Sequence, residues 1–336
     1  MSSRTASTSF ENVFRIPSSS FGKPSKKDII EVDNIYRICS VESDNPSRFK
    51  IRPVDITQRN WSRVGTASLA ATDVATSSCF VKQYIDRSGV RHPDHWQYEY
   101  EGALLAREIL GAIVTVPMLL LQDEQRLLNI FEHVELITVD ELLRQDETRF
   151  WKFYPLLLEQ FSDVLQAMKH GVQHELAAGL PVKQRSYASQ GLAINFKGFE
   201  IRNTGYQLPL DGGTGGGISL PPVVMFDFVR PYLAPIEEAA AKLLVSIALL
   251  NWGKPLSRFI KGHDAEMLDT AFYYIGQWTN RAAMEAELAI QEGFRFDTIK
   301  GASRSESQLK KAGLNLIGRR YLSRVRDWTM AHFPGE

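Results

Sequence analysis

The chain has 336 residues, which suits one large two-lobed unit or two closely packed domains. Hydrophobic residues make up 44% and charged residues 23%, an ordinary composition for a globular protein with a substantial core. The formal net charge at pH 7 is zero, so composition gives no general attraction to nucleic acid or to an anionic membrane. We therefore expect no nucleic-acid partner.

The sequence predicts a cytoplasmic protein without a membrane span. Its two cysteines, Cys39 and Cys79, cannot build a disulfide framework, so a reducing compartment is the simpler expectation. The longest apolar run, residues 109–121, is shorter than the ~20 residues that a membrane span needs. The N-terminus lacks the apolar core of a secretion signal. Arg4 and Arg15, with few acidic residues around them, leave a transit peptide as a less favoured alternative.

Three regions are expected in chain order. Residues 1–27 are rich in Ser, Pro and Lys and predict a flexible N-terminal arm. Residues 28–135 predict a β-rich lobe with one helix. Its first part alternates near period two, and residues 95–112 have helical spacing that ends at Gly111. Residues 116–136 complete this lobe as a β-hairpin.

Residues 136–336 predict a mainly helical C-terminal lobe. Thr138 and Glu141 have the spacing of a capping box at a helix start. Apolar residues at helical spacing then predict long helices over 151–172 and 235–253. Short extended stretches are expected at residues 199–208 and 223–228, with a flexible glycine-rich loop at 211–222 between them. Further helices are expected over residues 263–336.

Two segments of the first lobe carry charged residues beside apolar ones. Lys82 lies in an apolar strand, and a helix about twenty residues later carries Glu99 and Glu101.

Two segments of the second lobe carry oxygen ligands. Residues 198–203 read Gly-Phe-Glu-Ile-Arg-Asn, and a short apolar strand over 223–228 contains Asp227. An isolated carboxylate in such a strand needs a partner or a metal, because burying it alone costs several kcal/mol. Amide and carboxylate oxygens are both ligand types that Mg²⁺ accepts in proteins.

The order of these segments resembles the protein-kinase-like superfamily, nearest to aminoglycoside and lipopolysaccharide small-molecule phosphotransferases. Residues 198–203 are similar to the loop HGDFxxRN of those enzymes when Phe199, Arg202 and Asn203 are aligned. The resemblance covers roughly residues 30–260. It implies an α+β, two-lobed protein-kinase-like fold with a β-rich N-terminal lobe and a mainly helical C-terminal lobe.

The resemblance also implies ATP and Mg²⁺ as cofactors. The strand lysine would contact the α- and β-phosphates, the helix glutamate would orient it, and the hinge after the second hairpin strand would contact adenine. The residues implied for the nucleotide are Lys82, Glu101, Glu132 and Val134. We expect Glu101 to be the glutamate that pairs with Lys82, because Leu104 and Leu105 then face the core, and Glu99 is the second choice. The residues implied for the metal are Asn203 and Asp227.

Two positions depart from this pattern. Gly198 stands where the family has its catalytic aspartate, and glycine cannot accept a proton. Glu200 is the nearest carboxylate that could replace it as a catalytic base. The expected glycine-rich phosphate loop is represented only by Gly65, so close backbone approach to phosphates is less assured.

A second alignment gives a second candidate base. It places His174 and Glu175 in the catalytic-loop position, with Glu175 as the base, but Leu180 then stands where the asparagine is required. His170 and His174 also have a spacing that can bind zinc. No third ligand is apparent, so two polar histidines at a helix end are the favoured interpretation.

Two further segments have ordinary interpretations beside functional ones. Residues 211–217 lack the GK[ST] ending of a phosphate loop and predict a flexible connection. The basic residues between Lys300 and Arg324 predict a solvated helix face, or a surface for an anionic substrate or partner.

The favoured hypothesis is an ATP- and Mg²⁺-dependent phosphotransferase acting on a small molecule or glycoconjugate. The alternative is a pseudokinase, a nucleotide-binding or empty scaffold that works through a protein partner. A third hypothesis is an α+β interaction protein in which the order of these segments is coincidental.

Overall fold

A computed structural model describes most of the chain between residues 49 and 302. The described residues are 14–15, 30–32, 49–58, 62–71, 74–86, 88–124, 127–210, 220–248, 250, 263–302, 326–327 and 331. Most of the predicted arm 1–27, the loop 211–217 and nearly all of the basic segment 300–324 lie outside these residues. The chain divides into a sheet unit, residues 1–104 with 117–134, and a helical unit, residues 105–116 with 135–336.

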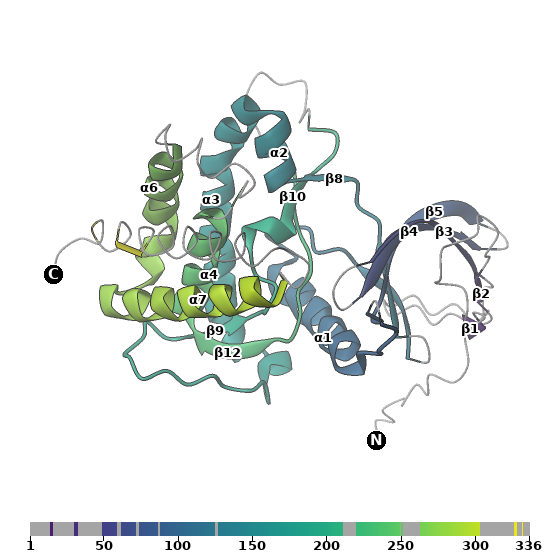
Figure 1. Cartoon of the computed structure of the whole chain (residues 1–336), viewed down its shortest axis with the longest axis horizontal. Helices are drawn as coiled ribbons and strands as arrows, with labels where there is room; N and C mark the ends of the chain where they lie inside the picture. Colours follow the sequence, from purple (N-terminus) through teal and green to yellow (C-terminus); the bar gives the residue numbers. More distant parts are fainter. Residues whose placement is uncertain are drawn as a thin grey trace, which may run out of the picture. The chain divides into compact units, whose positions relative to one another are not determined.

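The sheet unit is built on an antiparallel sheet with the strand order β1-β2-β3-β4-β5-β7-β6 (Figure 1). The strands are β1 (Phe14–Arg15), β2 (Ile30–Val32), β3 (Phe49–Gln58), β4 (Arg63–Ala71), β5 (Val74–Gln83), β6 (Leu119–Asp123) and β7 (Leu128–Glu132). Strands adjacent in sequence pair directly except around β5, which pairs with β7. The sheet and the hairpin predicted from the sequence are therefore both present.

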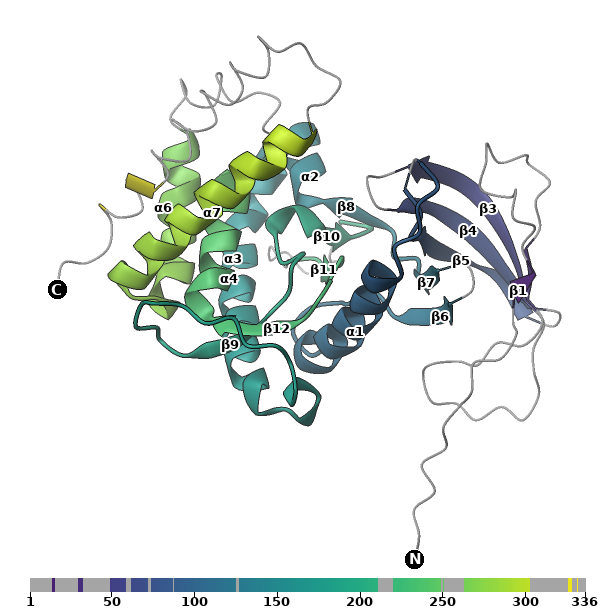
Figure 2. The same ribbon diagram turned by 60° about the horizontal axis from the view of Figure 1, so that its bottom comes forward.

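Helix α1 (Pro93–Leu110) starts in the sheet unit and packs on one face of the sheet (Figure 2). The indole Nε1 of Trp96 donates to the carbonyl oxygen of Leu128 at 3.0 Å. The side-chain amide of Asn129 donates back to the carbonyl oxygen of Trp96 at 3.2 Å. These bonds join the first turns of α1 to β7. The helix ends one residue before Gly111, as predicted.

Gly65 does not lie in a loop. It sits inside β4, where it pairs with Ile56 on β3 and Val81 on β5. The expectation that Gly65 stands in a phosphate-binding loop is therefore wrong. Because Gly65 is paired with a strand on each side, its backbone is extended and forms no turn.

The helical unit contains five described α-helices and five short strands. The helices are α2 (Val139–Gln145), α3 (Glu147–His170), α4 (Ile236–Ala248), α6 (His263–Ile275) and α7 (Arg281–Ala302). The strands are β8 (Leu136–Thr138), β9 (Leu192–Asn195), β10 (Thr204–Gln207), β11 (Val223–Met225) and β12 (Tyr232–Pro235). Four 3₁₀ turns are also described: η1 (Gly171–Gln173), η2 (Glu175–Ala177), η3 (Ile201–Asn203) and η4 (Gly276–Trp278).

The helix starts follow from capping residues. The capping box of Thr138 and Glu141 is present in both directions at the start of α2. Asp146 then caps α3 by accepting from the amide of Arg149 at 2.9 Å. Because of this cap, α3 begins at Glu147, four residues before the start predicted from apolar spacing alone.

A single apolar core is shared by α3, α4 and α6, and α7 crosses α4 (Figure 1). Polar contacts join the helices inside it. The hydroxyl of Tyr154 on α3 donates to the carbonyl oxygen of Met267 on α6 at 2.7 Å. The hydroxyl of Ser162 on α3 accepts from the indole of Trp278 at 3.0 Å. The core fixes α4 as the central support of the unit.

The helical unit also contains two small antiparallel sheets. One has the order β11-β10-β8, and the other pairs β12 with β9. The sequence did not predict β9 or β12. The extended stretch predicted over 199–208 is wrong in its first part, because residues 201–203 form the turn η3 and β10 begins at Thr204.

The α+β class is confirmed: one unit is dominated by an antiparallel sheet and the other by helices. Within the described residues, no helix combines the length and the apolar character that crossing a membrane requires.

Candidate functional site

Lys82 and Glu99 form an ion pair inside the sheet unit. The Nζ of Lys82, on β5, lies 3.0 Å from Oε1 and 2.9 Å from Oε2 of Glu99, on α1. The two side chains are only 14% and 5% exposed. Nζ also lies 5.5 Å from the ring centroid of Tyr84, within range of a cation–π contact. The contacts with Glu99 and Tyr84 thus fix the position of the Lys82 ammonium group.

Glu101 does not pair with Lys82, so the predicted choice between the two glutamates is wrong. Glu101 is exposed and accepts from the side chain of Gln97 at 2.9 Å. Successive residues of a helix lie 100° apart, so Glu99 shares a face with Ala103 and Ala106, and Glu101 points away from it. Ala103 and Ala106 are buried, which places Glu99 on the packed face.

The predicted adenine-contacting hinge follows β7. Glu132 ends this strand, donates its amide to the carbonyl oxygen of Met118 at 2.7 Å and accepts from the amide of Met118 at 3.3 Å through its carboxylate. In the part of the chain that the structure describes, no hydrogen bond is found for His133 or Val134.

In the helical unit, Asn203 is held at the end of a loop that runs from Phe196 to Asn203, called here the 196–203 loop. The side-chain Nδ2 of Asn203 donates to the carbonyl oxygen of Gly198 at 2.7 Å. Its backbone amide donates to the carbonyl oxygen of Glu200 at 3.0 Å. Because Nδ2 is used within the loop, Oδ1 is the side-chain atom of Asn203 that can serve a cation.

Asp227 is brought next to this loop by the β10–β11 pair. Thr204 pairs with Met225, and the amide of Phe226 donates to the carbonyl oxygen of Asn203 at 3.0 Å. Asp227 follows with a φ of +64°. That left-handed conformation is uncommon for a residue with a side chain, and such conformations concentrate at functional sites.

Gly198 lies against the backbone of Asp227. A Cβ atom built on Gly198 would be 1.8 Å from the backbone oxygen of Asp227 and 3.4 Å from Nδ2 of Asn203. Nothing larger than hydrogen fits there without movement of the main chain. The aspartate of the resembled loop is thus excluded at this position by the local backbone.

These residues suit a divalent cation that also binds phosphate. Asn203 Oδ1 and the Asp227 carboxylate are hard oxygen ligands, and Mg²⁺ commonly takes one or two protein ligands and completes its shell with water and phosphate oxygens. Among the described residues, no group of three or more His, Cys, Asp or Glu side chains forms an all-protein metal site.

The two candidate bases lie in different settings. Glu200 belongs to the 196–203 loop, and its Oε2 accepts from Arg202 Nη2 at 2.6 Å and from Nε at 3.2 Å. Glu175 is exposed in η2. No interaction in the described part of the chain links Glu175 to the 196–203 loop. Zinc binding was the less favoured interpretation of His170 and His174. Among the described residues, no group of three or more possible metal-binding side chains includes them.

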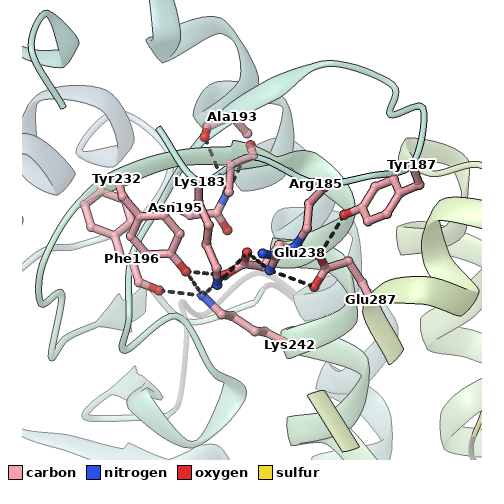
Figure 3. A network of polar contacts seen from close by, with 11 residues as sticks. Lys183, Arg185, Tyr187, Ala193, Asn195, Phe196, Tyr232, Glu238, Lys242 and Glu287 are labelled. Atoms are coloured by element: carbon pink, nitrogen blue, oxygen red, sulfur yellow. Dashed lines mark hydrogen bonds and ion pairs between the residues drawn. The ribbon is translucent and has the colours of Figure 1, made fainter. Parts of the chain in front are cut away.

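A buried charged network that the sequence analysis missed contacts the start of the 196–203 loop at Phe196 (Figure 3). Its centre is Glu238 on α4, whose side chain is fully buried. Its carboxylate oxygens lie 2.6 Å from Nη2 of Arg185, 3.0 Å from Nζ of Lys183 and 3.1 Å from Nζ of Lys242, and the hydroxyl of Tyr232 donates to it. The available signal was a Glu238–Lys242 pair at helical spacing inside a mainly apolar helix.

The network reaches α7 through Glu287, which binds Arg185 and accepts from the hydroxyl of Tyr187 at 2.7 Å. Burial alone would raise the pKa of Glu238, but the charges of Lys242 and Lys183 and the hydrogen bond from Tyr232 outweigh it and lower the pKa to about 2. Glu237 is different: burial raises its pKa, although the amide of Gln190 donates to it at 2.8 Å.

The predicted site residues thus fall into two groups. Lys82 and Glu99 are together in the sheet unit, which also contains the 132–134 segment. Asn203 and Asp227, with Gly198 between them, are together in the helical unit.

Comparisons with known proteins found similarity at the level of solved structures. No family model matches the chain, and no curated protein matches its sequence. A choline/ethanolamine kinase family protein from Mesorhizobium loti is 10% identical with a TM-score of 0.44, over 83% of this chain and 92% of that one. Choline kinase LicA from Streptococcus pneumoniae is 11% identical with a TM-score of 0.43, over 83% and 94%.

The amicoumacin kinase hAmiN, solved in complex with AMP-PNP, Ca²⁺ and Ami, is 12% identical with a TM-score of 0.42, over 82% of this chain and 88% of that one. All three TM-scores are below 0.5, and we base the functional proposal on the chain's own residues.

Proposed function

We propose that this protein binds Mg²⁺–ATP and acts as a phosphotransferase-like enzyme on a small molecule or glycoconjugate. Lys82, oriented by Glu99, would contact the nucleotide phosphates. The backbone at 132–134 would receive the adenine, and Asn203 with Asp227 would hold the cation. Bound Mg²⁺ would neutralise charge on the phosphates during transfer.

The Lys82–Glu99 ion pair is the single observation that carries this proposal. Both partners are largely removed from solvent, at 14% and 5% exposure, and such burial costs free energy that a surface pair avoids. A buried pair is weak evidence for stability by itself. A lysine held by a helix glutamate is, however, the arrangement that orients a cation toward ATP phosphates.

The second group of residues supports the metal part of the proposal. Asn203 is fixed by its bond to Gly198, so its Oδ1 needs no reorganisation to accept a cation. Asp227 is held beside it in a left-handed conformation. Oxygen ligands that are already in position lower the free-energy cost of binding Mg²⁺, an ion that gives up its bound water reluctantly.

The reaction would depend on positioning and charge neutralisation more than on a proton acceptor. Phosphoryl transfer needs little covalent chemistry from the protein. Glu200 is the carboxylate within the 196–203 loop, and Arg202 holds its Oε2. Its carboxylate is the group that would accept the proton of an attacking hydroxyl.

One observation favours a second candidate function. The exclusion of any side chain at Gly198 removes the usual proton acceptor, which is compatible with a pseudokinase that binds nucleotide without turnover. In that case the protein would act through a protein partner.

The test is the melting temperature of the purified protein with ATP, with and without Mg²⁺, in wild type and in the Asp227→Asn variant. Wild type should show a Mg²⁺-dependent rise that the variant loses, because the amide removes the negative ligand and leaves the shape of the side chain unchanged. A rise of equal size in both proteins, or no rise in wild type, would refute the proposed nucleotide site.

Turnover separates the enzyme from the pseudokinase. Phosphate transfer from ATP would be measured across a panel of hydroxylated small molecules, with Glu200→Gln as the matched variant. Transfer that slows in Glu200→Gln supports the enzyme. A Mg²⁺-dependent melting shift without transfer to any acceptor supports the pseudokinase.

A further inference from the structure

One face of α4 contacts the backbone of the 196–203 loop. Lys242 and Ser246 are four residues apart on this helix, which places them one turn apart on the same face. Both are buried, with exposures of 8% and 0%. Polar side chains in such positions need partners, because an unsatisfied buried group is costly.

The partners of both residues are backbone groups of the loop. The Nζ of Lys242 donates to the carbonyl oxygen of Phe196 at 3.4 Å, where the loop begins (Figure 3). The Oγ of Ser246 accepts from the amide of Ile201 at 3.1 Å, at the start of η3. It also donates to the carbonyl oxygen of Leu243 at 2.8 Å, so its hydroxyl is oriented.

We propose that Lys242 and Ser246 are positioning residues for Asn203, acting by clamping the two sides of the 196–203 loop. Phe196 precedes Gly198, whose carbonyl oxygen holds the Asn203 side chain, and Ile201 opens the turn that ends at Asn203. A shift at either anchor therefore changes where Oδ1 of Asn203 lies. Neither anchor touches nucleotide or metal in this scheme, and the inference rests on the proposed function.

The remaining network holds Lys242 in place. Glu238 and the hydroxyl of Tyr232 both contact Nζ, so the ammonium group cannot turn toward another partner without breaking these contacts. Arg185 lies at the outer end of the same network and contacts Glu238 and Glu287. No hydrogen bond or ion pair of Arg185 with the 196–203 loop is present among the described residues. Arg185 therefore provides a matched control for effects that come only from lost stability.

The experiment compares Ser246→Ala and Lys242→Met with Arg185→Met. Hydrogen–deuterium exchange of peptides covering 196–203 is measured without nucleotide, and the Mg²⁺ concentration that half-saturates the ATP-dependent melting shift is measured in parallel. The two anchor variants should show faster exchange in the loop and a Mg²⁺ midpoint raised about fivefold, the effect of losing a hydrogen bond of roughly 1 kcal/mol. Arg185→Met should lower the melting temperature and leave both loop readouts at the wild-type value.

The outcomes separate this inference from the proposed function. Unchanged loop exchange in both anchor variants, or equal changes in Arg185→Met, would overturn the clamp whether or not ATP binds. Faster loop exchange confined to the anchor variants, in a protein whose wild type shows no Mg²⁺–ATP shift, supports the clamp and rejects the nucleotide site.

Discussion

The backbone oxygen of Asp227 occupies the space that a side chain on Gly198 would need, with 1.8 Å between that oxygen and an ideal Cβ. Asn203 is 3.4 Å from the same point through its Nδ2. The three residues thus form one compact group in which glycine is a packing requirement.

Gly198→Ala should therefore destabilise the protein and weaken the metal site together. Accommodating the methyl group requires the main chain of Asp227 to move, and overpacking of this kind costs about 1–3 kcal/mol. The free energy of unfolding from urea titration and the Mg²⁺-dependent ATP melting shift would be measured. Gly198→Asp should be worse in both measurements, because its side chain is larger than the methyl group of alanine.

Gly171→Ala is the control for adding a methyl group at a glycine that has little space around it. Its nearest neighbour, Ile194 Cδ1 at 3.0 Å, is the end of a flexible side chain that can move. A smaller loss of stability and an unchanged Mg²⁺ response are expected. If Gly198→Ala behaves like Gly171→Ala in both measurements, the close approach to Asp227 has no functional consequence.

Glu99→Gln and Glu101→Gln should differ sharply in nucleotide affinity. The first removes the charge that holds Lys82, and losing a charge-assisted hydrogen bond costs about 1.5–3 kcal/mol, or tenfold or more in affinity. The second changes an exposed residue whose partner is Gln97, and surface substitutions usually change stability by less than about 0.5 kcal/mol. Isothermal titration with Mg²⁺–ATP measures the contrast, and equal affinities would contradict the role of Glu99.

The stability of the helical unit should fall in acid because of Glu238. Its pKa in the folded protein is about 2, below the ordinary value of 4.5, so the folded state holds the proton less tightly than the unfolded state. The contribution is present above pH 4.5 and is lost as the pH falls from 4.5 toward 2. The difference in unfolding free energy between wild type and Glu238→Gln should shrink by about 3 kcal/mol over that range, measured by urea titration.

Glu237, the adjacent residue, should show the opposite dependence. Burial raises its pKa, so the folded state holds the proton more tightly than the unfolded state. Its contribution is present below pH 4.5 and is lost as the pH rises above 4.5. Relative to Glu237→Gln, wild type should therefore lose stability as the pH rises from 4.5. A difference that stays constant with pH would contradict the direction of the shift.

The parts of the fold that depend on local sequence were predictable. The strand pattern around Lys82, the end of α1 before Gly111 and the capping box of Thr138 and Glu141 all rest on residues close together in the chain. The α+β class follows from the same periodicities. The start of α3 was missed by four residues because Asp146, the cap, precedes the apolar pattern.

The sequence by itself thus picked out the segments that carry Lys82, Asn203 and Asp227 from their residue types. The strand around Lys82 was also predicted, whereas Asn203 lies in η3 and Asp227 lies beyond β11, which ends at Met225 and does not continue over 223–228 as predicted. Only the tertiary structure decided that Glu99 rather than Glu101 binds Lys82, because this depends on which face of α1 is packed. It alone also revealed the contact of Gly198 with Asp227 and the buried network around Glu238. These contacts join residues far apart in the chain, and no local pattern encodes distances between segments that meet only when the core is formed.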